Sequence, residues 1–240
     1  MSFTNNLPGW LLLLAIGGGV IWIVSDYRAW KSLGKGGVPY NFRGWLMVTR
    51  FRLAKRDPFG THIYNDRIGG PDDSVQLDTL PTRQGPRPRI GVHPVPHRQL
   101  DQFAEGTMRQ QLDQLFNSFV SANDKRVCFS KSFYEKRNDA VTLIDVDNSQ
   151  ALAKISHGEA AHIHPADGSM HMIFSPSDAK QIIEKGWGER HPLAGVPNFD
   201  LPDTYLMIYT PRDPPELAVT AQLLLAAVQH LCMCDCTSIH

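Results

Sequence analysis

Residues 159–175 predict a β-hairpin, and this segment restricts the fold more than any other part of the chain. It reads EAAHIH, then PADGS, then MHMIFS. Two short strand-like runs flank Asp167-Gly168, a dipeptide that is typical of a two-residue hairpin turn. An isolated hairpin is only marginally stable in water, so it needs further strands or a helix to pack against. We therefore expect a mainly antiparallel sheet.

The predicted turn decides which histidines face one another. With Asp167-Gly168 as the loop, residue 164 pairs with 171 and residue 162 with 173. Side chains alternate between the faces of a strand, so His162, His164 and His171 share one face, and directly opposed Cβ atoms lie about 5 Å apart. Glu159 points to the other face unless a β-bulge interrupts the strand. The three imidazoles are expected to converge on one patch.

Three converging histidines could act in different ways. They could bind Zn or Fe, because imidazole suits both ions and three protein ligands with an open position form catalytic metal sites. Without a metal, one neutral imidazole could take a proton from an acidic enol while a second stabilises the oxyanion. They could also be ordinary polar residues on a solvated face. The residues leave these alternatives open.

A second candidate region is the segment KGWGERHPLAG, which follows a predicted helix. Trp187 offers an aromatic wall, Arg190 a fixed cation and His191 a titratable base, so a ring-shaped substrate could stack there. Arg83 and Arg87, in LPTRQGPRP, could hold a carboxylate or an enolate. Core packing for the tryptophan and ion pairing for the arginines are the structural alternatives.

The remaining patterns predict an α+β fold with helices flanking the sheet. Apolar residues recur every three to four positions over residues 99–120 and indicate an amphipathic helix. The other expected elements are strands at 127–133, 140–146 and 204–210, a helix from Ser177 to a glycine stop at Gly186, and a closing helix that ends near residue 230.

The amino-terminal segment predicts a membrane anchor. Residues 7–24 read LPGWLLLLAIGGGVIWIV and carry no charge, which is near the lower length for a helix that spans a bilayer. Basic residues follow it, so the positive-inside bias puts the main domain in the cytosol, with the endoplasmic reticulum as the default membrane. We therefore expect one N-terminal transmembrane helix, with residues 7–24 in the lipid bilayer. A buried helix is the alternative.

Four regions follow from these patterns: an anchor at 1–25, a juxtamembrane segment with wrapping loops at 26–98, a catalytic domain at 99–230 and a Cys-rich tail at 231–240. The chain has 24 basic and 24 acidic residues, so it lacks the electrostatic footprint of a nucleic-acid binder. No glycine-rich phosphate loop or dinucleotide fingerprint occurs, and no organic cofactor is expected.

Several motifs, in order over roughly residues 26–228, resemble the fungal luciferase family: DYRAW, NFRGW, IYNDR, LPTRQGPRP, the histidine hairpin, KGWGERHPLAG and YTPRDPPE. The resemblance implies an enzyme that adds O2 to an electron-rich hydroxylated α-pyrone, giving a peroxide that loses carbon dioxide. Residues at the family's motif positions are Glu159, His162, His164, His171, Trp187, Arg190 and His191. Residues 124–157 show no match, so the pocket wall and the substrate can differ.

Together these observations predict an O2-dependent oxygenase of an enolisable phenolic, α-pyrone or polyketide-type small molecule. Its catalytic candidates are His162, His164, His171, His191 and Glu159, acting as a base or a metal site, with O2 as co-substrate. One alternative is a non-oxidative cyclase, isomerase or dehydratase on the same scaffold. Another is a membrane-tethered protein that binds a small ligand or a metal without catalysis. Oxygen dependence separates the first hypothesis from both others.

Overall fold

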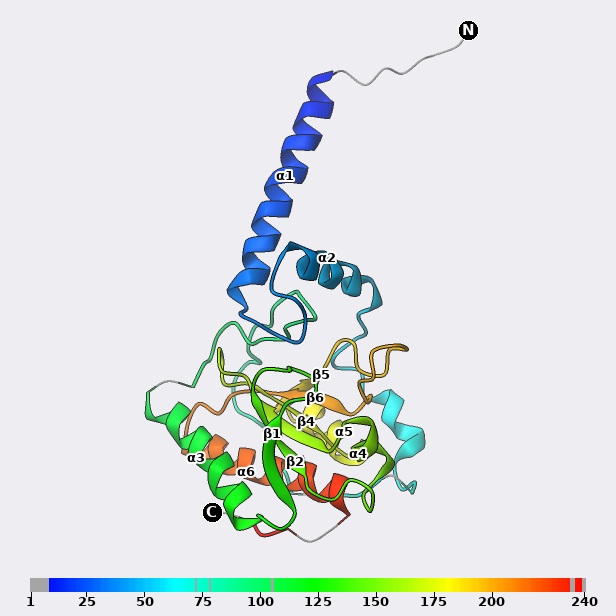
Figure 1. Ribbon diagram of the computed structural model, residues 1–240, viewed down its shortest axis with the longest axis vertical. Helices are drawn as coiled ribbons and strands as arrows, with labels where there is room; N and C mark the ends of the chain where they lie inside the picture. Colours follow the sequence, from blue (N-terminus) through cyan, green and yellow to red (C-terminus); the bar gives the residue numbers. More distant parts are fainter. Residues whose placement is uncertain (1–8, 72, 78, 105, 234–235, 239–240) are drawn as a thin grey trace.

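The computed structural model describes residues 9–71, 73–77, 79–104, 106–233 and 236–238. A six-stranded sheet, with strand order β1-β2-β3-β4-β6-β5, lies in the body of the molecule (Figure 1). Every neighbouring pair is antiparallel, so the predicted α+β class with a mainly antiparallel sheet is confirmed. The strands are β1 (Val127–Lys131), β2 (Asp139–Leu143), β3 (Glu159–Ile163), β4 (Met170–Ile173), β5 (Gly188–Arg190) and β6 (Tyr205–Ile208).

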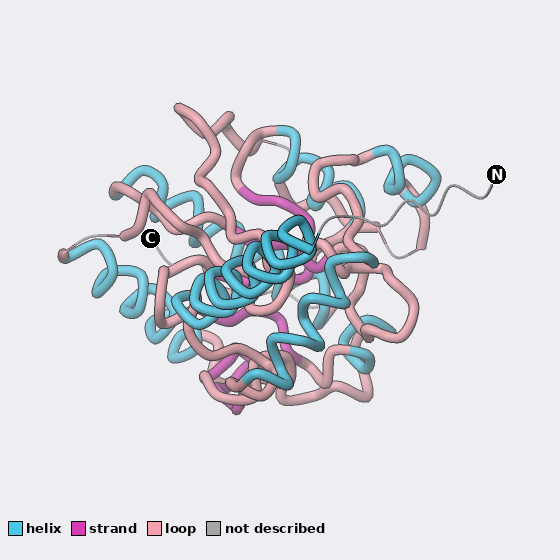
Figure 2. Tube along the Cα trace, turned by 90° about the horizontal axis from the view of Figure 1, so that it is seen from above, coloured by secondary structure: helices cyan, strands magenta, loops and turns pink. Residues whose placement is uncertain are grey.

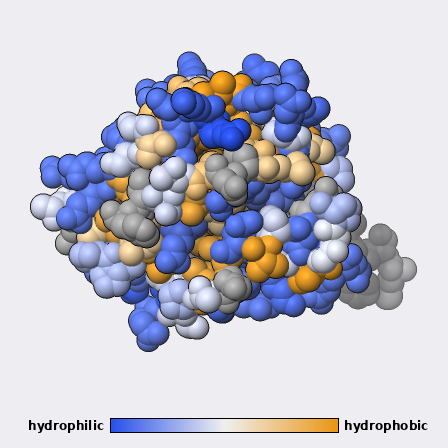
Figure 3. Space-filling model, turned by 90° about the horizontal axis from the view of Figure 1, so that it is seen from below, coloured by the Kyte–Doolittle hydropathy of each residue, from blue (hydrophilic) through white to orange (hydrophobic). Residues whose placement is uncertain are grey.

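Helices cover one face of the sheet, and the longest of them, α6 (Pro214–Cys232), packs against β2, β3 and β4. Alternate strand residues such as Ala161, Met172 and Leu206 enter the hydrophobic core. Three further helices are α3 (Thr107–Ala122), α4 (Ala151–Ile155) and α5 (Pro176–Glu184). Seen from below, the surface is mainly hydrophilic, with hydrophobic side chains in separate patches (Figure 3). The histidine-bearing strand positions alternate with the core positions.

The amino-terminal helix α1 (Gly9–Ser32) projects from the body, and α2 (Phe42–Phe51) lies beside its carboxy-terminal end (Figure 1). Trp30 and Trp45 are buried where the two helices meet. Asp26, in α1, accepts hydrogen bonds from the Trp45 indole and the Arg52 guanidinium, each at 2.7 Å. The last two turns of α1 are therefore part of the folded body.

The predicted transmembrane helix is wrong, because no helix among the described residues is long and apolar enough to cross a membrane. The charge-free run ends before Asp26, and three consecutive glycines, Gly17 to Gly19, lower its hydropathy. The described charge-free residues, 9–25, are therefore fewer and less apolar than the roughly 20 apolar residues that typically cross a bilayer. The predicted localisation, a single-pass protein of the endoplasmic reticulum membrane with a cytosolic domain, depended on this helix. That prediction is therefore not supported either. The described apolar side chains of α1 are largely exposed.

Other boundaries differ where tertiary contacts decide them. Helix α3 begins at Thr107, not near residue 99, because Gly106 has a φ of 55° and residues 99–104 are not helical. Helix α5 begins at Pro176, since the Ser175 side chain accepts the N–H of Asp178 as a cap. Residues 52–71, 73–77 and 79–98 contain two short 3-10 helices, η1 (Arg52–Ala54) and η2 (His62–Arg67), and otherwise form loops. Loops accordingly take up much of the outline seen from above (Figure 2).

Candidate functional site

The β3–β4 hairpin has a longer turn than the sequence suggests. His162 pairs with His171, and the His164 N–H donates to the Ser169 carbonyl at 2.8 Å. The loop therefore covers residues 165–168 instead of two residues. The register differs by two positions, an even number, which leaves each side chain on its predicted face. His162, His164 and His171, which we call the inner triad, lie together with ring centroids 4.7–5.4 Å apart.

Glu159 joins the inner triad through a β-bulge. The register of β2 and β3 shifts between Val141 and Thr142, so Ala160 is an extra residue in β3. This extra residue turns the Glu159 carboxylate to the histidine face, where Oε1 lies 2.5 Å from Nδ1 of His162. Without the bulge, the alternation of side chains along the strand would point Glu159 to the opposite face.

Glu159 is ionised in this setting. Burial acts to raise the pKa of its carboxyl, but donors from His162, Ser132 and the Phe133 backbone outweigh that effect and lower the pKa below its ordinary value. The Ser132 hydroxyl donates at 2.9 Å and the Phe133 N–H at 2.5 Å. A carboxylate can only accept hydrogen bonds, so Nδ1 of His162 carries the proton.

His164 is fixed by a two-step hydrogen-bond relay. Its Nδ1 lies 2.8 Å from the Ser169 hydroxyl oxygen, and that hydroxyl donates to Asp167 at 2.7 Å. Because the serine uses its proton on the carboxylate, it accepts one from His164. The proton of a neutral His164 ring is therefore on Nδ1, and the lone pair is on Nε2.

His171 follows the same pattern, since its Nδ1 lies 3.1 Å from the Leu206 carbonyl, which can only accept. All three rings of the inner triad thus donate outward from Nδ1. Their Nε2 atoms face inward, and those of His162 and His164 are 3.3 Å apart. Three nitrogen lone pairs converge inside the protein.

Burial lowers the pKa of His164, His171 and His191 well below the ordinary value of 6.5. Neighbouring positive charge lowers them further; for His164 the Arg98 guanidinium is the largest such contribution. These three rings are neutral at physiological pH, so each has one ring nitrogen that carries no proton.

A fourth histidine, His97, lies beside the triad. Its ring stacks on His171 at 5.6 Å between centroids and lies edge-on to His191 at 5.0 Å. Nε2 is 3.0 Å from a carboxylate oxygen of Glu189, whose other oxygen accepts the Tyr209 hydroxyl at 3.0 Å. The buried Nδ1 has no hydrogen-bond partner among the described residues. The ring is oriented by a carboxylate and has one nitrogen unused.

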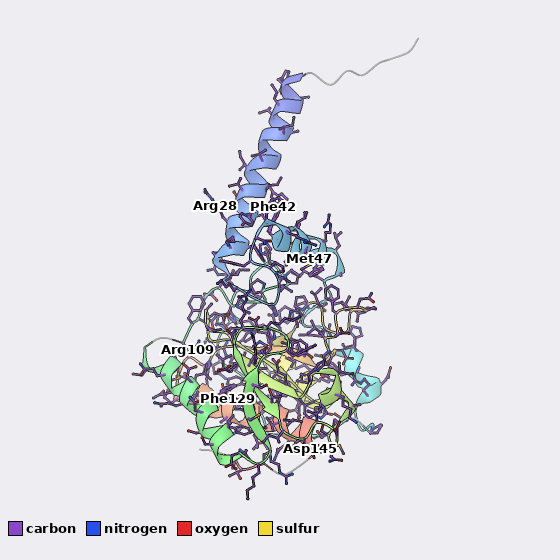
Figure 4. The ribbon with its side chains drawn as sticks, in the orientation of Figure 1. Arg28, Phe42, Met47, Arg109, Phe129 and Asp145 are labelled. Atoms are coloured by element: carbon purple, nitrogen blue, oxygen red, sulfur yellow. The ribbon has the colours of Figure 1, made fainter. Side chains whose placement is uncertain are left out.

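A pocket of about 480 Å³ has His97, His171, His191 and Tyr205 at its base. Its volume lies within the roughly 300–1,000 Å³ range of small-ligand sites. The walls come from α2, residues 94–96 and residues 197–201. Figure 4 labels Met47, which lines the pocket from α2, above the sheet. A cavity of about 510 Å³ between α3 and α6 has no charged or histidine side chain in its lining.

Glu135 connects this pocket with the inner triad. It lines the pocket, and its Oε1 lies 4.0 Å from Nε2 of His164. Its Oε2 accepts a hydrogen bond from the buried Arg98 at 2.8 Å. The Glu135 carboxyl group therefore contacts both the pocket and the edge of the inner triad.

The four residues predicted to bind substrate lie outside the pocket lining, and each donates at least one hydrogen bond to a protein acceptor. These acceptors are Glu216 for Arg83, the Gly188 and Ile183 carbonyls for Arg87, the Pro81 carbonyl for Trp187, and the Gly60 and Asp57 carbonyls for Arg190. Of the segment 185–195, the structure brings His191 to the base of the pocket and puts Trp187 in the hydrophobic core.

Two groups of three histidines have ligand atoms within 4.8 Å of one another: the inner triad, and the outer triad of His97, His171 and His191. In the outer triad, Nδ1 of His191 accepts the Leu193 N–H at 3.1 Å. The proton of a neutral His191 ring is therefore on Nε2, which leaves no nitrogen for a metal. Of the two groups, the inner triad alone offers three free lone pairs.

Sequence reasoning missed His97, Glu189 and Glu135. The partners His97 and Glu189 are 92 positions apart, and His97 lies in a proline-rich segment that predicts only loop. The one available signal was a histidine close to several prolines, which is too common to indicate a site.

Comparison with known proteins agrees with the motif pattern. A family model described as "Luciferase domain" matches residues 157–227. The chain is similar to "Luciferase" of Neonothopanus nambi, with 30% identity over 217 residues that cover 86% of this chain and 80% of the relative. The corresponding protein of Armillaria mellea is 30% identical over 223 residues, covering 88% and 82%. No solved structure matches.

Proposed function

The chain belongs to the fungal luciferase family, and from that premise we propose that it is an O2-dependent oxygenase of an enolisable phenolic, α-pyrone or polyketide-type small molecule. The observation that carries this proposal is the His97–Glu189 pair at the base of the pocket, with Nδ1 of His97 unused. Such a pair can remove a proton from an acidic hydroxyl group.

The pocket walls suit a flat, partly apolar substrate. Phe51, Phe199, Leu193 and Pro197 supply apolar surface, and the neutral Tyr205 phenol lies at the base. Burial raises the pKa of Tyr205 well above 10, and nearby carboxylates raise it further, so its hydroxyl stays protonated. An apolar cavity with a few polar groups at one end is typical of sites that orient small ring compounds.

The proposed reaction begins with proton transfer from the substrate enol to Nδ1 of His97. Glu189 accepts the Nε2–H and stabilises the imidazolium, as a carboxylate does in other acid–base pairs. The electron-rich enolate carbon then forms a C–O bond with O2. The substrate gives two electrons, O2 is reduced to the peroxide level, and His97 returns its proton to the peroxide. Each side chain starts and ends the step in the same protonation state.

An oxygen-electrode assay of the full chain with a hydroxylated α-pyrone tests this proposal. We expect O2 consumption in proportion to substrate loss, and no turnover in anaerobic solution. Unchanged turnover without oxygen contradicts the oxygenase and supports a cyclase, isomerase or dehydratase that uses the same base. Binding of the compound without any conversion supports a ligand-binding protein instead.

A further inference from the structure

We propose that the inner triad binds one divalent transition-metal ion through the Nε2 atoms of His162, His164 and His171. This inference concerns the deep side of the site and does not depend on the oxygenase proposal, which uses His97 and the pocket. Imidazole ligands without thiolates suit Zn(II) or Fe(II).

Hydrogen bonds fix the orientation of all three rings. Each Nδ1–H donates to a different acceptor: the Glu159 carboxylate, the Ser169 hydroxyl and a backbone carbonyl. Hydrogen bonds of this kind orient metal-binding histidines and make their other nitrogen a better ligand. If these histidines were ordinary polar residues on a solvated strand face, the rings would not need to be buried, and each would not need its own hydrogen-bond acceptor.

The ligand atoms of the three rings lie close enough together to share one ion. The Nε2 atoms of His162 and His164 lie 3.3 Å apart, and one ligand atom from each member of the triad lies within 4.8 Å of the others. With Zn–N bonds of about 2.0–2.1 Å, two ligands of a tetrahedral site are roughly 3.3–3.4 Å apart. The pair already has the spacing of two ligands on one ion.

Burying nitrogen lone pairs that face one another costs free energy. The His162 and His164 side chains are 1% and 0% exposed. Two buried acceptors that face each other without a shared cation repel, and each loses its contact with water. A proton on one Nε2 would bridge this pair but leave His171 without a partner, whereas a metal ion uses all three lone pairs.

Charge around the triad also favours a cation. The Glu159 carboxyl group lies behind His162, and that of Glu135 lies 4.0 Å from Nε2 of His164. The Arg98 guanidinium pairs with the far oxygen of Glu135, which leaves the near oxygen toward the triad. Because His171 and Glu135 both line the pocket, the ion would lie next to the substrate region and could act as a Lewis acid there.

Metal binding by the purified full chain tests the proposal. We expect elemental analysis to find about one Zn or Fe per chain. After chelation, Co²⁺ titration of the apoprotein should give a visible absorption band that saturates at one equivalent. His162→Ala removes a ligand and should abolish the band, whereas the exposed His62→Ala control should keep it. Ser169→Ala removes the acceptor behind His164 and should weaken binding by roughly 10- to 100-fold.

Three outcomes overturn the assignment. A folded wild-type chain that binds none of these ions shows that the triad is not a metal site. If His162→Ala still binds Co²⁺ fully and His191→Ala does not bind it, the ion belongs to the outer triad. If circular dichroism shows that His162→Ala is unfolded, the affinity of Ser169→Ala decides, and an unchanged affinity contradicts the proposal.

Discussion

His97 and Glu189 form a buried pair whose ring nitrogen and carboxylate oxygen lie 3.0 Å apart. The pair joins the loop that precedes α3 to strand β5. The Tyr209 hydroxyl donates to the second Glu189 oxygen and holds the carboxylate in place. Nδ1 of His97 has no hydrogen-bond partner among the described residues, and it is the atom that we propose accepts the substrate proton.

His97→Gln should lower kcat by about 10²- to 10⁴-fold, the usual range for loss of a general base, with a small change in KM. The amide keeps polar atoms near Glu189 but cannot accept a full proton. Steady-state kinetics with an α-pyrone substrate measure the effect, and the exposed His62→Gln serves as the matched control. Equal kcat values in the two variants exclude His97 as the base.

Glu189→Gln should also lower kcat, because a neutral amide stabilises the His97 imidazolium less than a carboxylate does. The two residues act as one unit, so their effects are not additive. The double variant should therefore be about as slow as His97→Gln alone. If the two losses instead multiply, Glu189 acts on the reaction by a route that does not include His97.

Arg190→Ala should lower the free energy of unfolding by roughly 1–3 kcal/mol, since it removes two part-buried hydrogen bonds from the guanidinium to carbonyls of the 57–60 loop. Urea unfolding measures the loss. Arg89→Ala, which removes an exposed ion pair with Asp101, should cost less than about 1 kcal/mol. A raised KM with unchanged stability would instead show that Arg190 binds substrate.

Asp178 should make stability depend on pH. Burial raises the pKa of its carboxyl from 3.8 to about 6. The folded chain holds this proton more tightly than the unfolded chain does. The contribution of Asp178 to the free energy of unfolding is therefore complete below pH 3.8 and is lost as the pH rises through 6. Relative to Asp178→Asn, the wild type should lose on the order of 3 kcal/mol between pH 4 and 7. Urea unfolding of both proteins at pH 4 and pH 7 tests this prediction. The same difference in free energy of unfolding between wild type and Asp178→Asn at the two pH values would contradict it.

The histidine hairpin shows how far sequence reasoning reaches. Strand alternation puts His162, His164 and His171 on one face, and this result survives the wrong turn length because the register moved by an even number of residues. The turn itself depends on Asp167, which accepts the N–H of Gln99 at 2.7 Å. A contact over 68 positions leaves no local signal.

The pocket could not be predicted for a related reason. Its walls combine α2, residues 94–97 and residues 197–201, which meet only in the folded chain. Residues 26–98 read as a separate wrapping segment, yet they supply His97 and Met47 to the site. The arginines and Trp187 were attractive as isolated residue types, but their hydrogen-bond partners are backbone carbonyls or a glutamate that the sequence does not identify.

Isotope labelling tests the central claim, which is that the pocket adds O2 to an enolisable substrate. The full chain is given substrate under ¹⁸O₂, and the products are analysed by mass spectrometry, with a parallel reaction in H₂¹⁸O under ordinary oxygen. The account predicts ¹⁸O in the organic product from ¹⁸O₂ and no enzyme-dependent incorporation from water. A product that forms without label from ¹⁸O₂ would contradict the oxygenase and leave proton transfer alone as the chemistry of this site.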